Sequence, residues 1–139
     1  NKEAATPIED RAGLVVIHSL GNFLDVLDAL PWLRSARTWY WGDLDRAGIT
    51  LLSRARARVP EIASLLMHAD TLREFEPLAN ADPSGRVDPP EPVLTQDERA
   101  ALEYLDAGQP PLRLEQERIP WHTAQTTINL AIDQAAVLD

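Results

Sequence analysis

The stretch that decides the fold is ARTWYWGDLDRAG, residues 36–48. Residues 36–42 are rich in aromatic and β-favouring side chains, and they predict a strand that runs straight into Asp43 and Asp45. Residues 46–59 then alternate apolar side chains with arginines until a proline follows, a pattern typical of an amphipathic helix. This stretch therefore predicts a strand and a helix that meet at two aspartates.

The segments on either side repeat this order. Upstream, residues 14–17 (LVVI) are a β-branched apolar run that predicts a buried strand, followed by a turn and a helix over residues 23–30. Downstream, residues 62–67 (IASLLM) predict a third strand. Repeated strand–helix–strand order predicts an α/β fold with a mostly parallel sheet of about four strands, flanked by helices on both faces.

The second half of the chain supplies the remaining elements. Residues 80–92 hold four prolines and predict a surface loop. Thr95 has the position of a helix N-cap and begins a helix that runs to about Asp106. Residues 112–119 alternate apolar and polar side chains, which favours a strand but leaves a short helix open, and residues 122–138 predict a last helix.

Composition limits the possible functions. The 139 residues suit one domain, and a hydrophobic content of 45% is enough for a buried core. The net charge of -9 argues against a broad basic surface for nucleic acid, unless bound divalent cations or another domain offset it. Cysteine is absent, which excludes disulfides, zinc–thiolate sites and thiol nucleophiles. Neither a membrane span nor a secretion signal is visible, so we expect a cytoplasmic protein without a membrane partner.

The two aspartates are the sharpest chemical signal. Because Asp43 and Asp45 are two residues apart at the end of a strand, their side chains are expected to point to the same side. Ligands of open α/β sheets bind at the carboxyl ends of strands, and Gly42 and Gly48 allow close approach there. Hard oxygen donors of this kind suit Mg²⁺ or Mn²⁺. The spacing leaves open another interpretation, in which Asp43 caps the next helix and Asp45 lies in its first turn.

A family resemblance goes further than spacing. The chain resembles the carboxy-terminal domain of JetD, the nuclease subunit of bacterial Wadjet plasmid-defence systems, which is itself similar to the Toprim domain of the cleaving subunit of topoisomerase VI. The resemblance rests on YWGDLD at residues 40–45 with Gly48, and on four further matches. These are LPWL at residues 30–33, ASLLM at residues 63–67, Thr71-Leu72, and LEQERI at residues 114–119.

The resemblance implies a Toprim-like domain of a metal-dependent DNA endonuclease that cuts plasmid or foreign DNA. Asp43 and Asp45 match its catalytic metal ligands, and Mg²⁺ or Mn²⁺ would be the cofactor. Double-stranded DNA and subunits of an SMC-type complex would be the partners, and a homodimer is left open. The nucleophile, which is either water or a tyrosine of another domain, and the number of metal ions are left open too.

The chain departs from the family pattern at two places. The pattern requires a glutamate at the end of the first strand, and in the resembling sequences this residue stands immediately before a stretch like Asn1-Lys2-Glu3. We therefore expect residues 1–139 to be a single Toprim-like domain, the C-terminal fragment of a larger protein, without the first strand and its glutamate. Isolated, such a fragment would be inactive. The second departure is His68 where an aspartate is expected, and Asp70 could take its place.

Two further sets of residues are weaker candidates. Glu115 and Glu117 would be additional metal ligands, or else one face of a solvated edge strand that pairs with neighbouring arginines. Three arginines of the helix over residues 46–59 could contact the DNA backbone, although their pattern favours a solvated helix face. These arginines are Arg46, Arg54 and Arg58.

Two other functions compete with the endonuclease. The first is a non-catalytic module of the same fold that binds DNA or partner subunits. The second is a different enzyme with a D-x-D motif, such as a phosphatase or a sugar-phosphate transferase. That enzyme would need a nucleophilic first aspartate and a downstream lysine, whereas the only lysine of this chain is Lys2.

Overall fold

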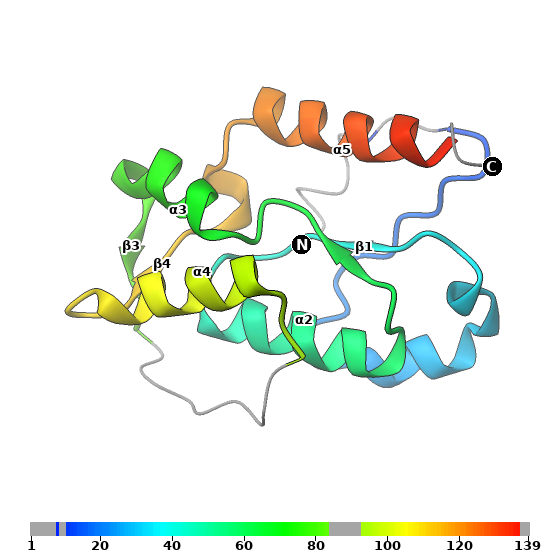
Figure 1. Cartoon of the computed structure of the whole chain (residues 1–139), viewed down its shortest axis with the longest axis horizontal. Coiled ribbons are helices and arrows are strands. Elements are labelled where there is room, and N and C mark those ends of the chain that lie inside the picture. The colour runs from blue at the N-terminus through cyan, green and yellow to red at the C-terminus, as the bar shows by residue number, and fades with distance from the viewer. Residues whose placement is uncertain (1–7, 9–10, 84–92, 137–139) are drawn as a thin grey trace.

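The computed structural model describes residue 8, residues 11–83 and residues 93–136. Four α-helices and four short strands form the described part of the chain, together with four 3₁₀ helices (Figure 1). In chain order the elements are η1 (Leu24–Ala29), η2 (Pro31–Arg34), β1 (Trp39–Tyr40), α2 (Arg46–Arg58), β2 (Ala63–Ser64), α3 (Ala69–Phe75), η3 (Glu76–Leu78), β3 (Asn80–Ala81), α4 (Gln96–Ala107), β4 (Leu112–Arg113), η4 (Gln116–Arg118) and α5 (Trp121–Ala136).

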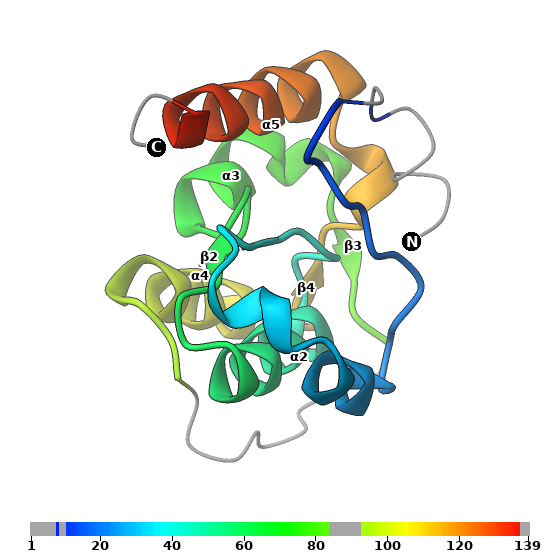
Figure 2. The ribbon, with the colours of Figure 1, turned by 90° about the vertical axis from the view of Figure 1, so that its right-hand side faces the viewer.

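The unit predicted around the two aspartates is present. Strand β1 pairs in parallel with β2, with Trp39 opposite Ala63 and Tyr40 opposite Ser64, and α2 is the crossover helix between them. The helices α5 and α2 lie on opposite sides of this strand pair (Figures 1 and 2). The prediction of an α/β fold with a parallel strand pair is therefore confirmed at this level.

The predicted sheet of about four strands is not found among the described residues. The described residues form two sheets of two strands each, and only the β1–β2 sheet is parallel, because β3 and β4 run antiparallel. Residues 14–17 are not a strand, and Val15 is 62% exposed. None of the described strands pairs with this run, so extended backbone here would leave its N–H and C=O groups without partners. Residues 112–119 keep only β4 as a strand and then turn into η4.

Other differences concern the helices. The helix predicted over residues 23–30 is the 3₁₀ helix η1, and η2 continues it after Pro31. Helix α3 had no counterpart among the predicted elements. Part of the predicted proline-rich loop (84–92), the end of the last helix (137–138) and Asn1–Glu3 lie outside the described residues. Within the described residues, no helix is both long and apolar enough to cross a bilayer.

The core lies between the helices and the strands. Its fully buried large side chains come from the turn after β1, from three helices, and from the segments beside β2 and β4. They are Leu44, Ile49, Leu52, Met67, Leu72, Leu105 and Leu114. Leu44 and Leu114 also exchange two backbone hydrogen bonds, of 2.8 and 3.0 Å, so the segment after β1 is tied to the segment after β4.

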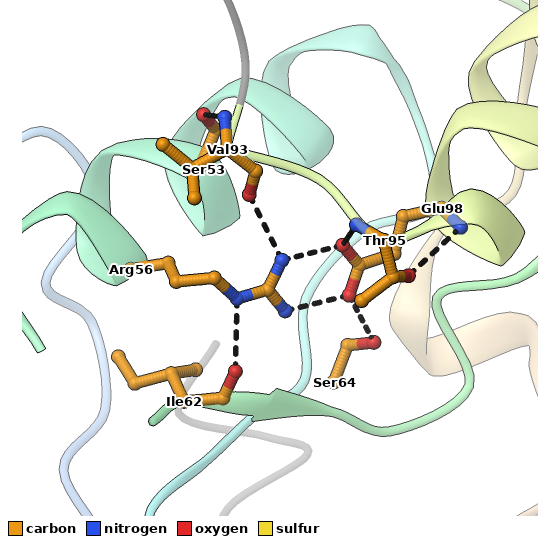
Figure 3. Close-up of polar contacts among 7 residues, drawn as sticks. All are labelled: Ser53, Arg56, Ile62, Ser64, Val93, Thr95 and Glu98. Carbon is orange, nitrogen blue, oxygen red and sulfur yellow. Dashed lines mark hydrogen bonds and ion pairs between the residues drawn. The ribbon is translucent and has the colours of Figure 1, made fainter. Parts of the chain in front are cut away.

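A buried ion pair fastens three of these elements together. The guanidinium of Arg56 on α2 donates to both carboxylate oxygens of Glu98 on α4, at 2.6 and 2.7 Å (Figure 3). Its Nε and Nη1 also donate to the backbone carbonyls of Ile62 and Val93, both at 2.9 Å. Ser64 of β2 donates to the same carboxylate at 2.6 Å. All three nitrogens of this guanidinium thus donate to acceptors inside the protein.

Glu98 also completes the predicted start of α4. The Thr95 hydroxyl accepts from the Glu98 N–H, and the Glu98 carboxylate accepts from the Thr95 N–H at 2.8 Å, which is a capping box. Burial opposes ionisation of this carboxylate, but the hydrogen bonds from Arg56, Ser64 and Thr95 outweigh it and lower the pKa of Glu98 to about 2. Glu98 is therefore charged at neutral pH although it is only 1% exposed.

Candidate functional site

Asp45 is fixed by the start of α2. It is the N-cap residue with extended backbone, and its Oδ1 accepts a hydrogen bond from the N–H of Gly48 at 2.6 Å. The cap is thus Asp45, whereas the capping interpretation of the sequence assigned it to Asp43. Asp45 is buried, with 6% of its surface exposed. Its other oxygen, Oδ2, lies 3.3 Å from Nε of Arg113.

Asp43 is held in a similar way from another direction. Its Oδ1 accepts a hydrogen bond from the backbone N–H of Gln116 at 2.9 Å, and its Oδ2 accepts one from Nη2 of Arg113 at 3.4 Å. Each aspartate therefore has one oxygen anchored by a backbone N–H and the other oxygen turned toward the same guanidinium. The two carboxylates share one cation, and in the described structure that cation is Arg113.

Glu115 belongs to the same cluster. Its Oε1 lies 3.2 Å from Nη2 of Arg113, and its Oε2 lies 3.0 Å from Nε of Arg118. Glu117 is exposed on η4 and makes none of the described contacts of the cluster. Of the second acidic pair singled out in the sequence, the structure thus brings Glu115 to the aspartates.

Burial and neighbouring charge both act on Asp45. Burial is the largest influence and raises its pKa, and the charges of Asp43 and Asp82 raise it further. The hydrogen bond from Gly48 and the charge of Arg113 work in the opposite direction, but the net shift is upward. Burial is therefore the main reason that the charged form of Asp45 is disfavoured.

Tyr40 of β1 contacts the first turn of α2, which follows the two aspartates. Its hydroxyl donates to the backbone carbonyl of Gly48 at 3.3 Å. Burial, followed by the charges of Asp45 and Asp43, raises the pKa of this phenol above its ordinary value. Tyr40 is consequently a neutral, half-buried side chain whose hydroxyl stabilises the start of α2.

The three arginines singled out as DNA contacts have partners within the chain. Arg46 forms an ion pair with Asp106 on α4, and Arg58 forms ion pairs with two aspartates of η1. Arg54 donates to the side-chain oxygen of Asn22 at 3.0 Å. Because all three neutralise or bind polar groups of this chain, a DNA phosphate would have to compete with these groups.

The position where an aspartate was expected has a structural role. His68 is the N-cap of α3, where its Nδ1 accepts from the N–H of Thr71 at 3.4 Å. Asp70, the suggested substitute, has a side chain that is 86% exposed and pairs with Arg73 at 2.6 Å. Neither residue is among the described contacts of the aspartate cluster.

Sequence reasoning missed two members of the site. Arg113 was only one of the neighbouring arginines expected to pair with Glu115 and Glu117, and Asp82 fell within the predicted loop. Asp82 is 5% exposed, and its charge acts on Asp45. The antiparallel pairing of β3 with β4, which places Asn80 opposite Arg113, brings both residues near the aspartates. Sequence offered no signal for this pairing because each strand is only two residues long.

The two aspartates offer oxygen donors of the type that divalent cations prefer. Among the described residues, no group of three or more His, Asp or Glu side chains is spaced to hold a metal ion. However, the Oδ2 atoms of Asp43 and Asp45 both already face a cation, and carboxylate oxygens are the donors that Mg²⁺ and Mn²⁺ prefer. Both aspartates also line a largely apolar cavity of about 500 Å³ beside β1. A metal ion would therefore need the position that Arg113 has taken.

Gly48 allows the first turn of α2 to lie close to the backbone of Asp43. A Cβ at this position would overlap the backbone carbonyl oxygen of Asp43 and come within 3.3 Å of Oδ1 of Asp45. Replacement of Gly48 with alanine is therefore expected to push α2 away from the turn and to lower the free energy of unfolding by about 1–3 kcal/mol. Urea unfolding of the variant measures this. A matched replacement is Ala47→Ser on the exposed side of α2, and equal stability of both variants would contradict the expectation.

Comparison with known proteins adds one finding. A family model described as "Wadjet protein JetD, C-terminal" matches residues 1–128, which include the two aspartates, Arg113 and Glu115. No curated protein sequence matches the chain.

Proposed function

Since the chain belongs to the Wadjet protein JetD C-terminal family, we propose that it is a Toprim-like, divalent-metal-dependent endonuclease domain that cleaves plasmid or other foreign DNA. Membership of the family implies a role in Wadjet defence. The observation that carries the rest of the proposal is the shared orientation of Asp43 and Asp45, whose Oδ2 atoms face a single cation. We further propose that this defence role brings double-stranded DNA and an SMC-type complex as partners.

In this proposal Asp43 and Asp45 would hold Mg²⁺ or Mn²⁺. The cation would neutralise charge that develops on the phosphate and would help to activate the attacking group. The protein keeps the two carboxylates in place with backbone N–H groups, those of Gly48 and Gln116, so that the carboxylates themselves are already oriented. Tyr40 is not the nucleophile of this proposal. Its hydroxyl donates a hydrogen bond to the Gly48 carbonyl, and its raised pKa keeps the phenol protonated.

The competing function is a non-catalytic module of the same family that binds DNA or partner subunits. The observation that favours it is Arg113, because an arginine that neutralises the carboxylates also satisfies them without any metal ion. The two functions differ in what they predict for the covalent state of DNA.

Cleavage of supercoiled plasmid by the full-length protein tests the proposal. With the other Wadjet subunits present, we expect conversion to nicked or linear DNA in Mg²⁺ or Mn²⁺. Conversion should stop in EDTA and resume when the metal ion is restored, because phosphodiester cleavage then depends on the carboxylate-bound cation. Plasmid that stays supercoiled in both metals, although it is bound by the protein, would favour the non-catalytic module.

A further inference from the structure

Arg113 lies where the proposed function requires a metal ion. Its guanidinium is within 3.2–3.4 Å of carboxylate oxygens of Asp43, Asp45 and Glu115. Its backbone is held by β4, and the next residue, Leu114, bonds back to the turn between the two aspartates. The backbone of Arg113 is therefore fixed beside the aspartates by β4 and by the hydrogen bonds of Leu114.

The contacts of this guanidinium are poor for an arginine with three acidic neighbours. Nε of Arg113 is buried, yet it makes no hydrogen bond, although Asp45 Oδ2 is 3.3 Å away. The buried Arg56 offers a comparison in the same chain, since it binds both oxygens of Glu98 at 2.6 and 2.7 Å. Arg56 is thus a permanently paired arginine with optimal geometry, whereas Arg113 neutralises its carboxylates through long and misaligned contacts.

The charges around Arg113 also indicate that one guanidinium neutralises these carboxylates incompletely. Asp43, Asp45 and Glu115 all pair with it. A second arginine reaches only Glu115, through Oε2. Because three carboxylates face one guanidinium, a dication in its place would neutralise more of their charge than Arg113 does.

We propose that Arg113 is a positioning residue that acts as a replaceable counter-ion. It holds Asp43 and Asp45 in their binding geometry while no metal ion is bound, and it gives up their Oδ2 atoms when a divalent cation arrives. This inference rests on the proposed metal-dependent function and adds to it a residue that competes with the metal ion.

Binding of Mn²⁺ to the full-length protein tests this inference without any cleavage assay. The dissociation constant is measured by electron paramagnetic resonance of free Mn²⁺ for wild type, Arg113→Gln and Arg113→Lys. We expect Arg113→Gln to bind about tenfold more tightly, because a competing positive charge is removed at similar volume. Arg113→Lys keeps the charge and should bind like wild type, as should the exposed control Arg73→Gln.

Thermal unfolding provides a second test, because a purely structural role of Arg113 would not make the loss of melting temperature depend on Mn²⁺. The melting temperature of Arg113→Gln should fall below that of wild type in EDTA and recover in Mn²⁺, since the metal ion replaces the missing counter-charge. A loss of equal size in both conditions would overturn the inference, as would unchanged or weaker Mn²⁺ binding. If neither wild type nor Arg113→Gln binds Mn²⁺, the proposed metal-dependent function itself fails.

Discussion

Replacement of Asp43 or Asp45 with asparagine is expected to lower metal-dependent plasmid cleavage by about 100-fold or more. Asparagine keeps one side-chain oxygen but removes the negative charge that would hold the cation. Asp45→Asn should still cap α2, because asparagine is as good an N-cap residue as aspartate. The variants therefore separate the role in cation binding from the role in folding.

Cleavage rates and melting temperatures should be measured on the same protein preparations. The matched control is Asp70→Asn, which removes an equal charge from an exposed position on α3. We expect this control to cut at the rate of wild type. If Asp43→Asn and Asp45→Asn also cut at that rate, the two aspartates have no part in the reaction. If they lose activity only together with their fold, the loss carries no information about cation binding.

Replacement of Glu98 with glutamine is expected to destabilise the fold by about 3–5 kcal/mol, because it leaves the buried Arg56 guanidinium without its counter-charge. Urea unfolding of the chain measures this difference. Glu103→Gln on the exposed side of the same helix is the control, and it should change the free energy of unfolding by less than about 0.5 kcal/mol. Equal stability of the two variants would contradict the structural role of the pair.

Acid unfolding provides an independent check on Glu98. Its pKa is lowered to about 2 in the folded chain, from 4.5 for an ordinary glutamate. A lowered folded pKa stabilises the protein above the unfolded pKa, and this contribution is lost as the pH falls from about 4.5 toward 2. The stability of wild type should therefore decline through this window more steeply than that of Glu98→Gln. Parallel pH profiles would show that the pair contributes little.

The buried pair also bears on the candidate site. Arg56 and Asp45 lie on the same helix, α2, with Asp45 capping its first turn and Arg56 near its end. Arg56 attaches this helix to α4 and to the segment around β2, whereas Asp45 faces Arg113 of β4. The position of one aspartate thus depends on packing at the far end of the helix that it begins.

Local signals in the sequence were sufficient for several elements. The predicted helix over residues 46–59 is α2, and the Thr95 cap with Glu98 three residues later marks the start of α4. Periodicity and capping are properties of neighbouring residues, so they can be recognised without knowing the rest of the fold. The parallel pairing of β1 with β2 followed from strand–helix–strand order for the same reason. The strand prediction for residues 14–17 failed, because an apolar run forms a strand only when a partner strand is available.

What the sequence by itself determined is therefore the α/β unit around the aspartates, and with it the two carboxylates placed at the end of a strand. Only the tertiary structure decided what these carboxylates face. Arg113 comes from a position 70 residues away from Asp43, and Glu98 lies 42 residues from Arg56. Such pairs are formed by packing of elements that are distant in the chain. The physical reason is that charge interactions depend on distance in space, which local sequence patterns do not encode.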